Sequence, residues 1–254
     1  MLLRLVSSDW LKTKRTPIRL LTAAAILGYP ALFLWYFARR AHTAELPFVI
    51  HEIFFDSASI VLPMGTGLLA GLLAAQEENA GHFNGLLGQN ASRTMVYISK
   101  LLLLVLLAAV FLFGSLLLLL PGMRYILHLE QPGAEMFLLS GLLALAGSLA
   151  VCTFHLFLAL AYGLGASIGA GGAGLLVAAI IGTTSIGDPI WPYVPWSWPA
   201  RLARLPAAAM AGNSHTLLRD GLIRGLVPAS IVFLIATVCS ILWFCRWEGR
   251  KSYE

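Results

Sequence analysis

The stretch 101-LLLLVLLAAVFLFGSLLLLL-120 contains no charged residue, and Ser115 is its most polar side chain. A helix needs roughly 20 mostly apolar residues to cross the hydrocarbon core of a bilayer. A run of this length and composition is typical of a membrane-spanning helix, so this segment decides the class of the fold.

Five further apolar runs flank it. The sequence predicts six spans, at residues 17–37, 54–75, 101–120, 136–160, 164–186 and 222–244. Only 11% of the residues are charged, whereas soluble domains carry about 25%. We therefore expect an all-α integral membrane protein with one transmembrane domain over residues 1–254 and no soluble catalytic domain.

The basic residues predict an orientation. An even number of spans puts both termini on one side, and ten of the 17 Lys and Arg residues fall on the side of the termini. Because cytoplasmic segments are enriched in Lys and Arg, we expect a multi-pass protein of the cell membrane with both termini in the cytoplasm. The net charge of +5 favours membrane lipid with anionic headgroups as a partner, and not nucleic acid, because no basic reading motif is present.

Residues 1–16 have the pattern of a short amphipathic helix. Leu3, Val6 and Trp10 recur at helical spacing, and Lys12, Lys14 and Arg15 gather near the end of the segment. Such a helix is expected to lie in the inner membrane interface before the first span.

The largest expected cytoplasmic loop covers residues 76–99. It begins with polar residues, and Phe83, Leu86 and Leu87 then form an i, i+3, i+4 apolar stripe. This pattern predicts a short amphipathic helix between the second and third spans. Its apolar stripe must be buried against lipid or against a partner protein.

The expected external loop covers residues 187–221 and begins with an unusual aromatic segment, 188-DPIWPYVPWSWP-199. Its four prolines exclude a regular helix or central strand across that segment. Tryptophan and tyrosine favour the membrane–water boundary. The segment is therefore either an interfacial anchor or part of a gate or substrate surface, and its candidate residues are Asp188, Trp191, Tyr193, Trp196 and Trp198.

Two motifs resemble catalytic signatures but lack the required context. Residues 169-GAGGAG-174 match the dinucleotide pattern GxGxxG, yet they lie inside an apolar run, where small residues at Gly165, Gly169, Ala170 and Gly174 favour close helix packing. His51-Glu52 begins like HExxH, but position 55 is Phe. No Walker A sequence is present. We expect no catalytic residue, no metal site and no cofactor bound by this chain.

Three ionisable residues within or beside the spans have two interpretations each. His155, inside the fourth span, is either a neutral imidazole bonded to a neighbouring helix or a functional group. Glu52 and Asp56 share one helix face near the start of the second span. They either meet a cationic substrate or mark a solvated helix start.

The loop and the aromatic segment together carry a resemblance. The order Glu77-Glu78, Phe83, Leu86-Leu87, Ser92-Arg93, Tyr97 and Lys100 resembles the permease subunits of ABC exporters of the six-helix class. The segment 191-WPYVPWSWP-199 is similar to the one between the last two spans of lantibiotic-immunity permeases. His82-Phe83 departs from this pattern, which more often has a small polar residue and Trp there.

The resemblance implies a division of labour between subunits. The loop would act as a coupling helix docked on a separate cytoplasmic ATPase, present in two copies, which binds ATP and Mg. The docking residues would be Glu77, Glu78, His82, Phe83, Leu86, Leu87 and Arg93. A second permease, either related or identical, would complete the complex, and the cargo would be a lantibiotic or similar cationic amphipathic peptide.

Two other classes of function remain open from the residues alone. A membrane-embedded enzyme requires convergent polar groups near the interface, and only His51, Glu52 and Asp56 are candidates. An ion-coupled carrier favours internal repeats and charges at mid-membrane, and the sequence shows no clear repeat.

Overall fold

The computed structural model describes residues 1–40, 43, 45–81, 83, 86, 88, 91–129, 133–212 and 215–249. Every regular element among these residues is helical. In chain order they are α1 (Leu2–Lys12), η1 (Thr13–Arg15), α2 (Pro17–Phe37), α3 (Leu46–Asn79), α5 (Arg93–Tyr125), α6 (Ala134–Tyr162), α7 (Leu164–Val177), η2 (Ala178–Gly182), η3 (Ser185–Gly187), η4 (Trp191–Tyr193), η5 (Pro195–Ser197), α8 (Trp198–Gly212) and α9 (His215–Arg246).

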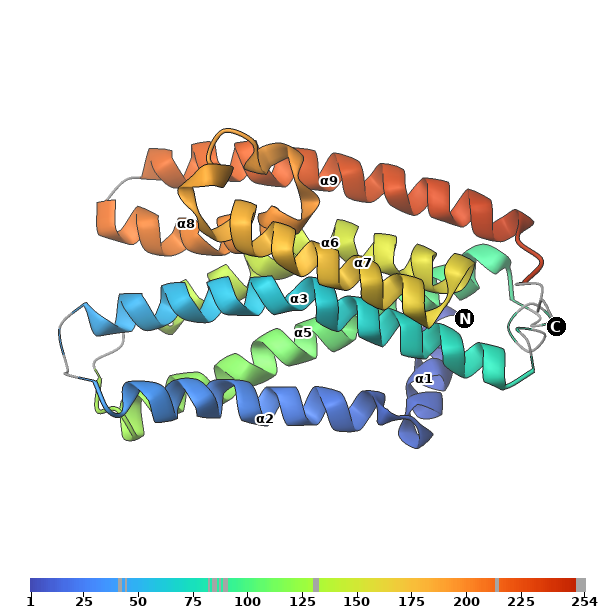
Figure 1. The fold of residues 1–254 in the computed structure, drawn as a ribbon, viewed down its shortest axis with the longest axis horizontal. Helices are drawn as coiled ribbons and strands as arrows, with labels where there is room; N and C mark the ends of the chain where they lie inside the picture. The colour runs from blue at the N-terminus through green and yellow to red at the C-terminus, as the bar shows by residue number, and fades with distance from the viewer. Residues whose placement is uncertain are drawn as a thin grey trace.

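The long helices run side by side in one bundle (Figure 1). The short helix α1 lies at one end of the bundle, the end at which α9 stops, and we call this the α1 end. The opposite end, where α2 stops and α9 begins, we call the far end.

Six helices of the described part of the chain are long and apolar enough to span a membrane, as predicted. They lie at Pro17–Phe37, Leu46–Asn79, Arg93–Tyr125, Ala134–Tyr162, Leu164–Gly182 and Leu218–Arg246. Several are longer than the predicted runs: α3 has 34 residues, which corresponds to about 51 Å at 1.5 Å per residue. Such a helix extends beyond the hydrocarbon core or tilts within it.

The bundle has a centre and a periphery. More than half of the apolar window is buried in α3 (56%) and α6 (61%), against 11% in α2 and 17% in α9. Lipid is as apolar as leucine, so an exposed apolar face on a spanning helix is no anomaly. The central helices α3 and α6 carry the fully buried histidines His51 and His155. The peripheral helices α2 and α9 present broad apolar faces outward.

Glycines bring α3 and α7 close together. A Cβ atom at Gly171 would lie 2.9 Å from the Pro63 carbonyl oxygen, and one at Gly174 would clash with the Trp196 indole. A Cβ atom at Gly165 or Gly169 would instead meet no atom of another described segment within 4 Å. Close packing by small residues is thus present, but on the face of α7 that carries Gly171 and Gly174.

The fifth span changes from α-helix to π-helix before it ends. The α-helical part of α7 ends at Val177, and the π-helix η2 ends at Gly182. Three short 3-10 turns follow, and α8 then runs toward the far end beside α9 (Figure 1). The expectation of one external loop over residues 187–221 is therefore wrong for its second half. α8 forms because Trp198, Leu202 and Ala203 are fully buried against the bundle.

The loop between the second and third spans is shorter than the expected 76–99. α3 continues to Asn79 and α5 begins at Arg93, where the Ser92 hydroxyl accepts a hydrogen bond from the Met95 amide as an N-cap. The predicted amphipathic helix falls on a segment in which His82 and Leu87 lie outside the described residues.

Candidate functional site

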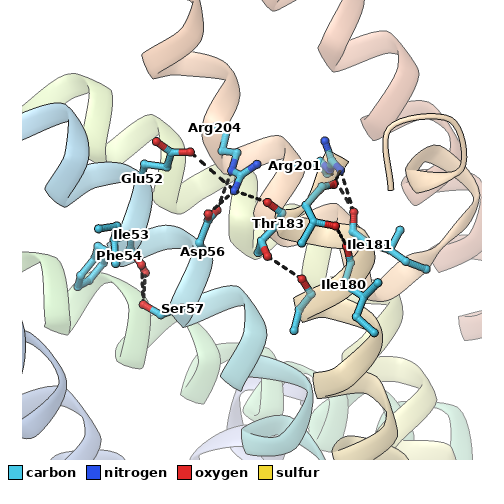
Figure 2. A network of polar contacts seen from close by, with 12 residues as sticks. Glu52, Ile53, Phe54, Asp56, Ser57, Ile180, Ile181, Thr183, Arg201 and Arg204 are labelled. Atoms are coloured by element: carbon cyan, nitrogen blue, oxygen red, sulfur yellow. Dashed lines mark hydrogen bonds and ion pairs between the residues drawn. The ribbon is translucent and has the colours of Figure 1, made fainter. Parts of the chain in front are cut away.

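Two carboxylates of the second span meet a guanidinium group of α8. Arg204 Nε donates to Asp56 Oδ1 at 2.7 Å, and Arg204 Nη2 donates to Asp56 Oδ2 (Figure 2). Glu52, one turn away, has its Oε1 3.8 Å from Arg204 Nη2. The Asp56 side chain is 16% exposed and the Glu52 side chain 61%. Asp56 therefore forms a bidentate, charge-assisted ion pair with Arg204, whereas most of the Glu52 side chain remains exposed.

Arg204 and its neighbour Arg201 also bond to the end of the fifth span. Arg204 Nη2 donates to the Thr183 carbonyl at 3.1 Å, and Arg201 donates to the carbonyls of Ile181 and Thr184 (Figure 2). The last carbonyls of a helix have no intrahelical partner and carry partial negative charge. Two guanidinium groups thus satisfy the backbone where η2 stops.

Asp188 completes what we call the Arg204 cluster: Glu52, Asp56, Thr183, Asp188, Arg201 and Arg204. Arg201 Nη1 donates to Asp188 Oδ1 at 2.6 Å, and the Asp188 side chain is 62% exposed. Three carboxylates face two guanidinium groups, so the cluster carries one negative charge in excess. Burial alone would lower the pKa of Arg204, but the hydrogen bonds and the charge of Asp56 outweigh it and raise that pKa.

The structure thus brings together Glu52, Asp56 and Asp188, three of the residues that the sequence singled out. Sequence reasoning missed Arg201 and Arg204, because it treated residues 187–221 as a loop. One signal was available: both arginines follow Trp198 at helical spacing, on a segment whose Leu202 and Ala203 are apolar.

The aromatic segment folds inward. Trp198 is fully buried and its Nε1 donates to the Pro192 carbonyl at 3.1 Å. Trp191 is 8% exposed, and Trp196 packs edge-on against Phe154 of α6 at 5.7 Å. Only Tyr193, at 82% exposed, points away from the bundle among these four aromatic side chains. The three tryptophans therefore lie against glycines of α6, α7 and α9.

A second charged cluster ties α1 to the bundle. Lys100 Nζ lies 2.7 Å from Asp9 Oδ1 and 2.5 Å from Glu77 Oε1, and Lys12 Nζ lies 2.8 Å from the same Glu77 oxygen. The Ser99 hydroxyl donates to Asp9 Oδ2 at 2.6 Å. These five residues, which we call the Lys100 cluster, join α1, α3 and α5. Glu77 was expected to dock on the ATPase. It is only 4% exposed, so its carboxylate is instead buried within the chain.

The described residues of the α3–α5 loop also pack within the chain. Phe83 is 1% exposed and Leu86 2%, and the Phe83 ring lies 4.9 Å from the Trp247 ring. Phe83 adopts a positive φ of 65°, which is uncommon for a bulky residue. Arg93 Nη1 donates to the Cys245 and Trp247 carbonyls at 3.0 and 2.6 Å. Glu78 is half-buried at the end of α3. The Phe83 ring thus packs on Trp247, directly after α9, and Leu86 belongs to the same buried cluster as Phe244 of α9.

His155 lies fully buried beside the small residues that join α3 and α7. Its Nδ1 is 3.4 Å from the Ser167 hydroxyl, which donates to the Gly67 carbonyl at 2.8 Å. Its Nε2 has no hydrogen-bond partner among the described residues. His155 thus packs within this helix contact.

A comparison with protein families decides the class. A family model described as an ABC-2 family transporter protein matches residues 5–184, which is more than half of the chain. The chain belongs to the ABC-2 transporter family. No curated protein and no solved structure gives a significant match.

Membership makes the chain the membrane permease of an ABC transporter, a transport subunit that associates with an ABC ATPase subunit. The matched part of the permease includes the Lys100 cluster, the α3–α5 loop, Glu52, Asp56 and Thr183. It stops before Asp188, Arg201 and Arg204. The arginine half of the Arg204 cluster is therefore a feature of this permease outside the matched family region.

Proposed function

We propose that this permease is the membrane subunit of an ATP-driven exporter that removes a lantibiotic or similar cationic amphipathic peptide from the membrane to the outside. The observation that supports this cargo is the excess negative charge of the Arg204 cluster. Glu52 and Asp188 are both more than half exposed, and each contacts one of the two arginines that bond to the end of the fifth span. A cationic peptide arriving there meets these exposed carboxylates.

The proposal places the α1 end in the cytoplasm and the Arg204 cluster toward the outside. The basic segment Lys12-Thr13-Lys14-Arg15 supports this orientation. Two copies of the ATPase, which bind ATP and Mg, dock at the α1 end. A second permease, either a related chain or another copy of this one, completes the complex.

The α3–α5 loop is the proposed docking element, in a modified form. Phe83 and Leu86 anchor the loop to α9 from within, because both are buried in the chain. Glu78 and Arg93 flank the loop at the ends of α3 and α5, and His82 and Leu87 remain docking candidates. A movement of the loop against the ATPase then reaches α9 through Trp247 and reaches α1 through Glu77.

Transport requires two arrangements of the bundle whose balance ATP shifts. The Arg204 cluster joins α3, the end of η2 and α8. We propose that these three elements separate when the permease opens toward the outside. A cationic group of the cargo then replaces the Arg204 guanidinium group beside Glu52.

The test is protection of cells. A lantibiotic-sensitive host producing the permease with its ATPase should tolerate several-fold more lantibiotic than a host producing the ATPase alone. Glu52→Gln should lower this tolerance. Glu135→Gln should not, because Glu135, in the first turn of α6, is an exposed carboxylate outside the cluster. Equal tolerance with and without the permease, across cationic lantibiotics, would exclude this cargo class.

A further inference from the structure

The fifth span ends in a rare kind of helix. Residues Ala178–Gly182 form the π-helix η2, whereas the preceding residues, Leu164–Val177, are α-helical. A π-helix pairs residue i with residue i+5, so its turn takes up one residue more than an α-helical turn, and such turns appear mostly singly within α-helices, frequently at functional sites. A π-turn at this position therefore needs interactions that favour it over the α-helix.

Two threonine hydroxyls supply part of these interactions. The Thr183 hydroxyl donates to the Ala179 carbonyl at 2.6 Å, and the Thr184 hydroxyl donates to the Ile180 carbonyl at 2.5 Å. In an α-helix, the backbone N–H groups of Thr183 and Thr184 would bond to these same two carbonyls. A hydroxyl that bonds four residues back competes with the backbone and bends the helix. Both threonines thus weaken the α-helical alternative.

Arg201 of α8 supplies the rest. Its Nε and Nη2 donate to the Ile181 carbonyl at 3.2 and 3.0 Å (Figure 2), and Nη2 also donates to the Thr184 carbonyl at 2.6 Å. The Arg201 side chain is only 13% exposed. One planar guanidinium group therefore binds carbonyls on both sides of Gly182, the last π-helical residue, which the ammonium group of a lysine does not reproduce.

The chain after η2 lies tightly against it. A Cβ atom at Gly187 would overlap the Ile181 carbonyl group, so only glycine fits there, and the Gly187 N–H donates to the Thr184 carbonyl at 3.2 Å. The helix before η2 is fixed differently, because the Ser167 hydroxyl of α7 donates to the Gly67 carbonyl of α3 at 2.8 Å. A change in η2 therefore moves the chain that follows it and leaves α7 in place.

We propose that η2 is a switch between π-helix and α-helix, and that Arg201 holds it in the π form. When α8 moves and withdraws the guanidinium group, the backbone closes to i→i+4 bonds and releases one residue. The chain beyond η2 then advances by about 1.5 Å and turns by about 100°, the rise and angle of one α-helical residue. Asp188, whose side chain is 62% exposed, turns away from Arg201 with it. The switch rests on the movement of α8 that we propose for transport, but not on the nature of the cargo.

Hydrogen–deuterium exchange of the amides in residues 183–188 measures the state of this switch. The permease, produced with its ATPase and reconstituted in nanodiscs, is compared in the nucleotide-free and vanadate-trapped states. We expect exchange to be several-fold faster in the trapped state, because the turn loses the bonds that the Gly187 and Asp188 amides make to the Thr184 and Ser185 carbonyls. Arg201→Gln should show this fast exchange without nucleotide, and also in the permease alone. Arg224→Gln, which removes an exposed arginine of α9, should exchange like the wild type.

A one-residue deletion separates a switch from a fixed bulge. Deletion of Ile180 converts η2 to an α-helix and keeps the register of the chain on both sides. This variant should unfold near the wild-type temperature and exchange slowly in both states. Deletion of Ala173, within the regular part of α7, shifts the register of the helix contact and should lower the unfolding temperature.

Equal exchange of residues 183–188 in the wild type and in Arg201→Gln would overturn the proposal, even where the deletion variant does not fold. Nucleotide-dependent exchange that persists after deletion of Ile180 would also overturn it. Fast exchange in Arg201→Gln, combined with no response of the wild type to vanadate trapping, would support the switch and contradict the proposed movement of α8.

Discussion

Arg204 and Asp56 lie 148 positions apart in the sequence and form a two-armed ion pair that joins α8 to α3 (Figure 2). The pair adds to the burial of Trp198 in holding α8, which contains Pro199 and Pro206, against the bundle. It also fixes the guanidinium group that donates to the Thr183 carbonyl at the end of the fifth span.

Removing one partner of this pair should destabilise the permease. Asp56→Ala leaves the Arg204 guanidinium group half-buried without its carboxylate, and we expect a loss of about 3 kcal/mol. Arg204→Ala should cost a similar amount, and the double variant less than the sum of the two. Thermal unfolding in detergent, arranged as a double-mutant cycle, measures the coupling. Additive losses would show that the two side chains do not interact.

Substitution of Lys100 should destabilise the permease even more. Lys100→Met leaves Asp9 without its principal cation and Glu77 with Lys12 alone, at positions where both carboxylates are almost fully buried. We expect a loss of about 3–5 kcal/mol in thermal unfolding. Lys14→Met, which alters an exposed lysine of the same region, should change stability little. Equal effects of the two changes would contradict a structural role for Lys100.

Replacing a glycine that packs against the aromatic segment by a larger residue should destabilise the fold. A Cβ atom at Gly147 would lie 2.9 Å from the backbone of Trp198 and Pro199, so Gly147→Val must displace main chain. We expect a loss of roughly 1–3 kcal/mol or more. Gly169→Val, which meets open space, should remain within about 0.5 kcal/mol of the wild type. Unfolding curves of the two variants that coincide would argue against the inward position of the segment.

The proposed orientation has its own test. In a background with the native cysteines replaced by alanine, Glu135→Cys at the far end should react with a membrane-impermeant maleimide in intact cells. Lys14→Cys at the α1 end should react only after permeabilisation. Both positions are exposed in the structure. The reverse pattern would place both termini outside.

The spans were predictable because crossing a bilayer imposes a length and composition that no other element meets, and 101–120 satisfies it without tertiary help. α8 was not. Its prolines and arginines resemble a loop locally, and its helix depends on burial of Trp198 and on the distant Asp56. Local patterns contain no information about a partner so far away in sequence.

The docking loop shows the same limit. The spacing of Phe83 and Leu86 predicts that they must be buried, and they are, but the pattern does not say against what. The structure supplies α9 and Trp247 as their neighbours. Likewise, the sequence predicts that Glu77 lies at a solvated helix end. Its burial is favourable only because Lys12 and Lys100 pair with its carboxylate.

Phe83 gives a prediction that separates anchoring from direct docking. Phe83→Ala removes the ring that packs on Trp247, and burial losses of this kind cost about 3–5 kcal/mol. If the ring anchors the loop from within, the ATPase should still bind but hydrolyse ATP with weaker dependence on the permease. Loss of binding with the loop's protease resistance intact would instead show direct contact with the ATPase.

The most direct test of the central claim is the ATP hydrolysis of the purified complex. The tagged permease is produced with its ATPase, isolated in mild detergent and reconstituted, and vanadate-sensitive hydrolysis is measured with and without a lantibiotic. We predict that the ATPase co-purifies, that the peptide stimulates hydrolysis, and that Glu52→Gln weakens this stimulation while Glu135→Gln does not. A permease that is isolated alone, with no hydrolysis at any peptide concentration, would contradict the account and favour an ion-coupled carrier or a membrane-embedded enzyme.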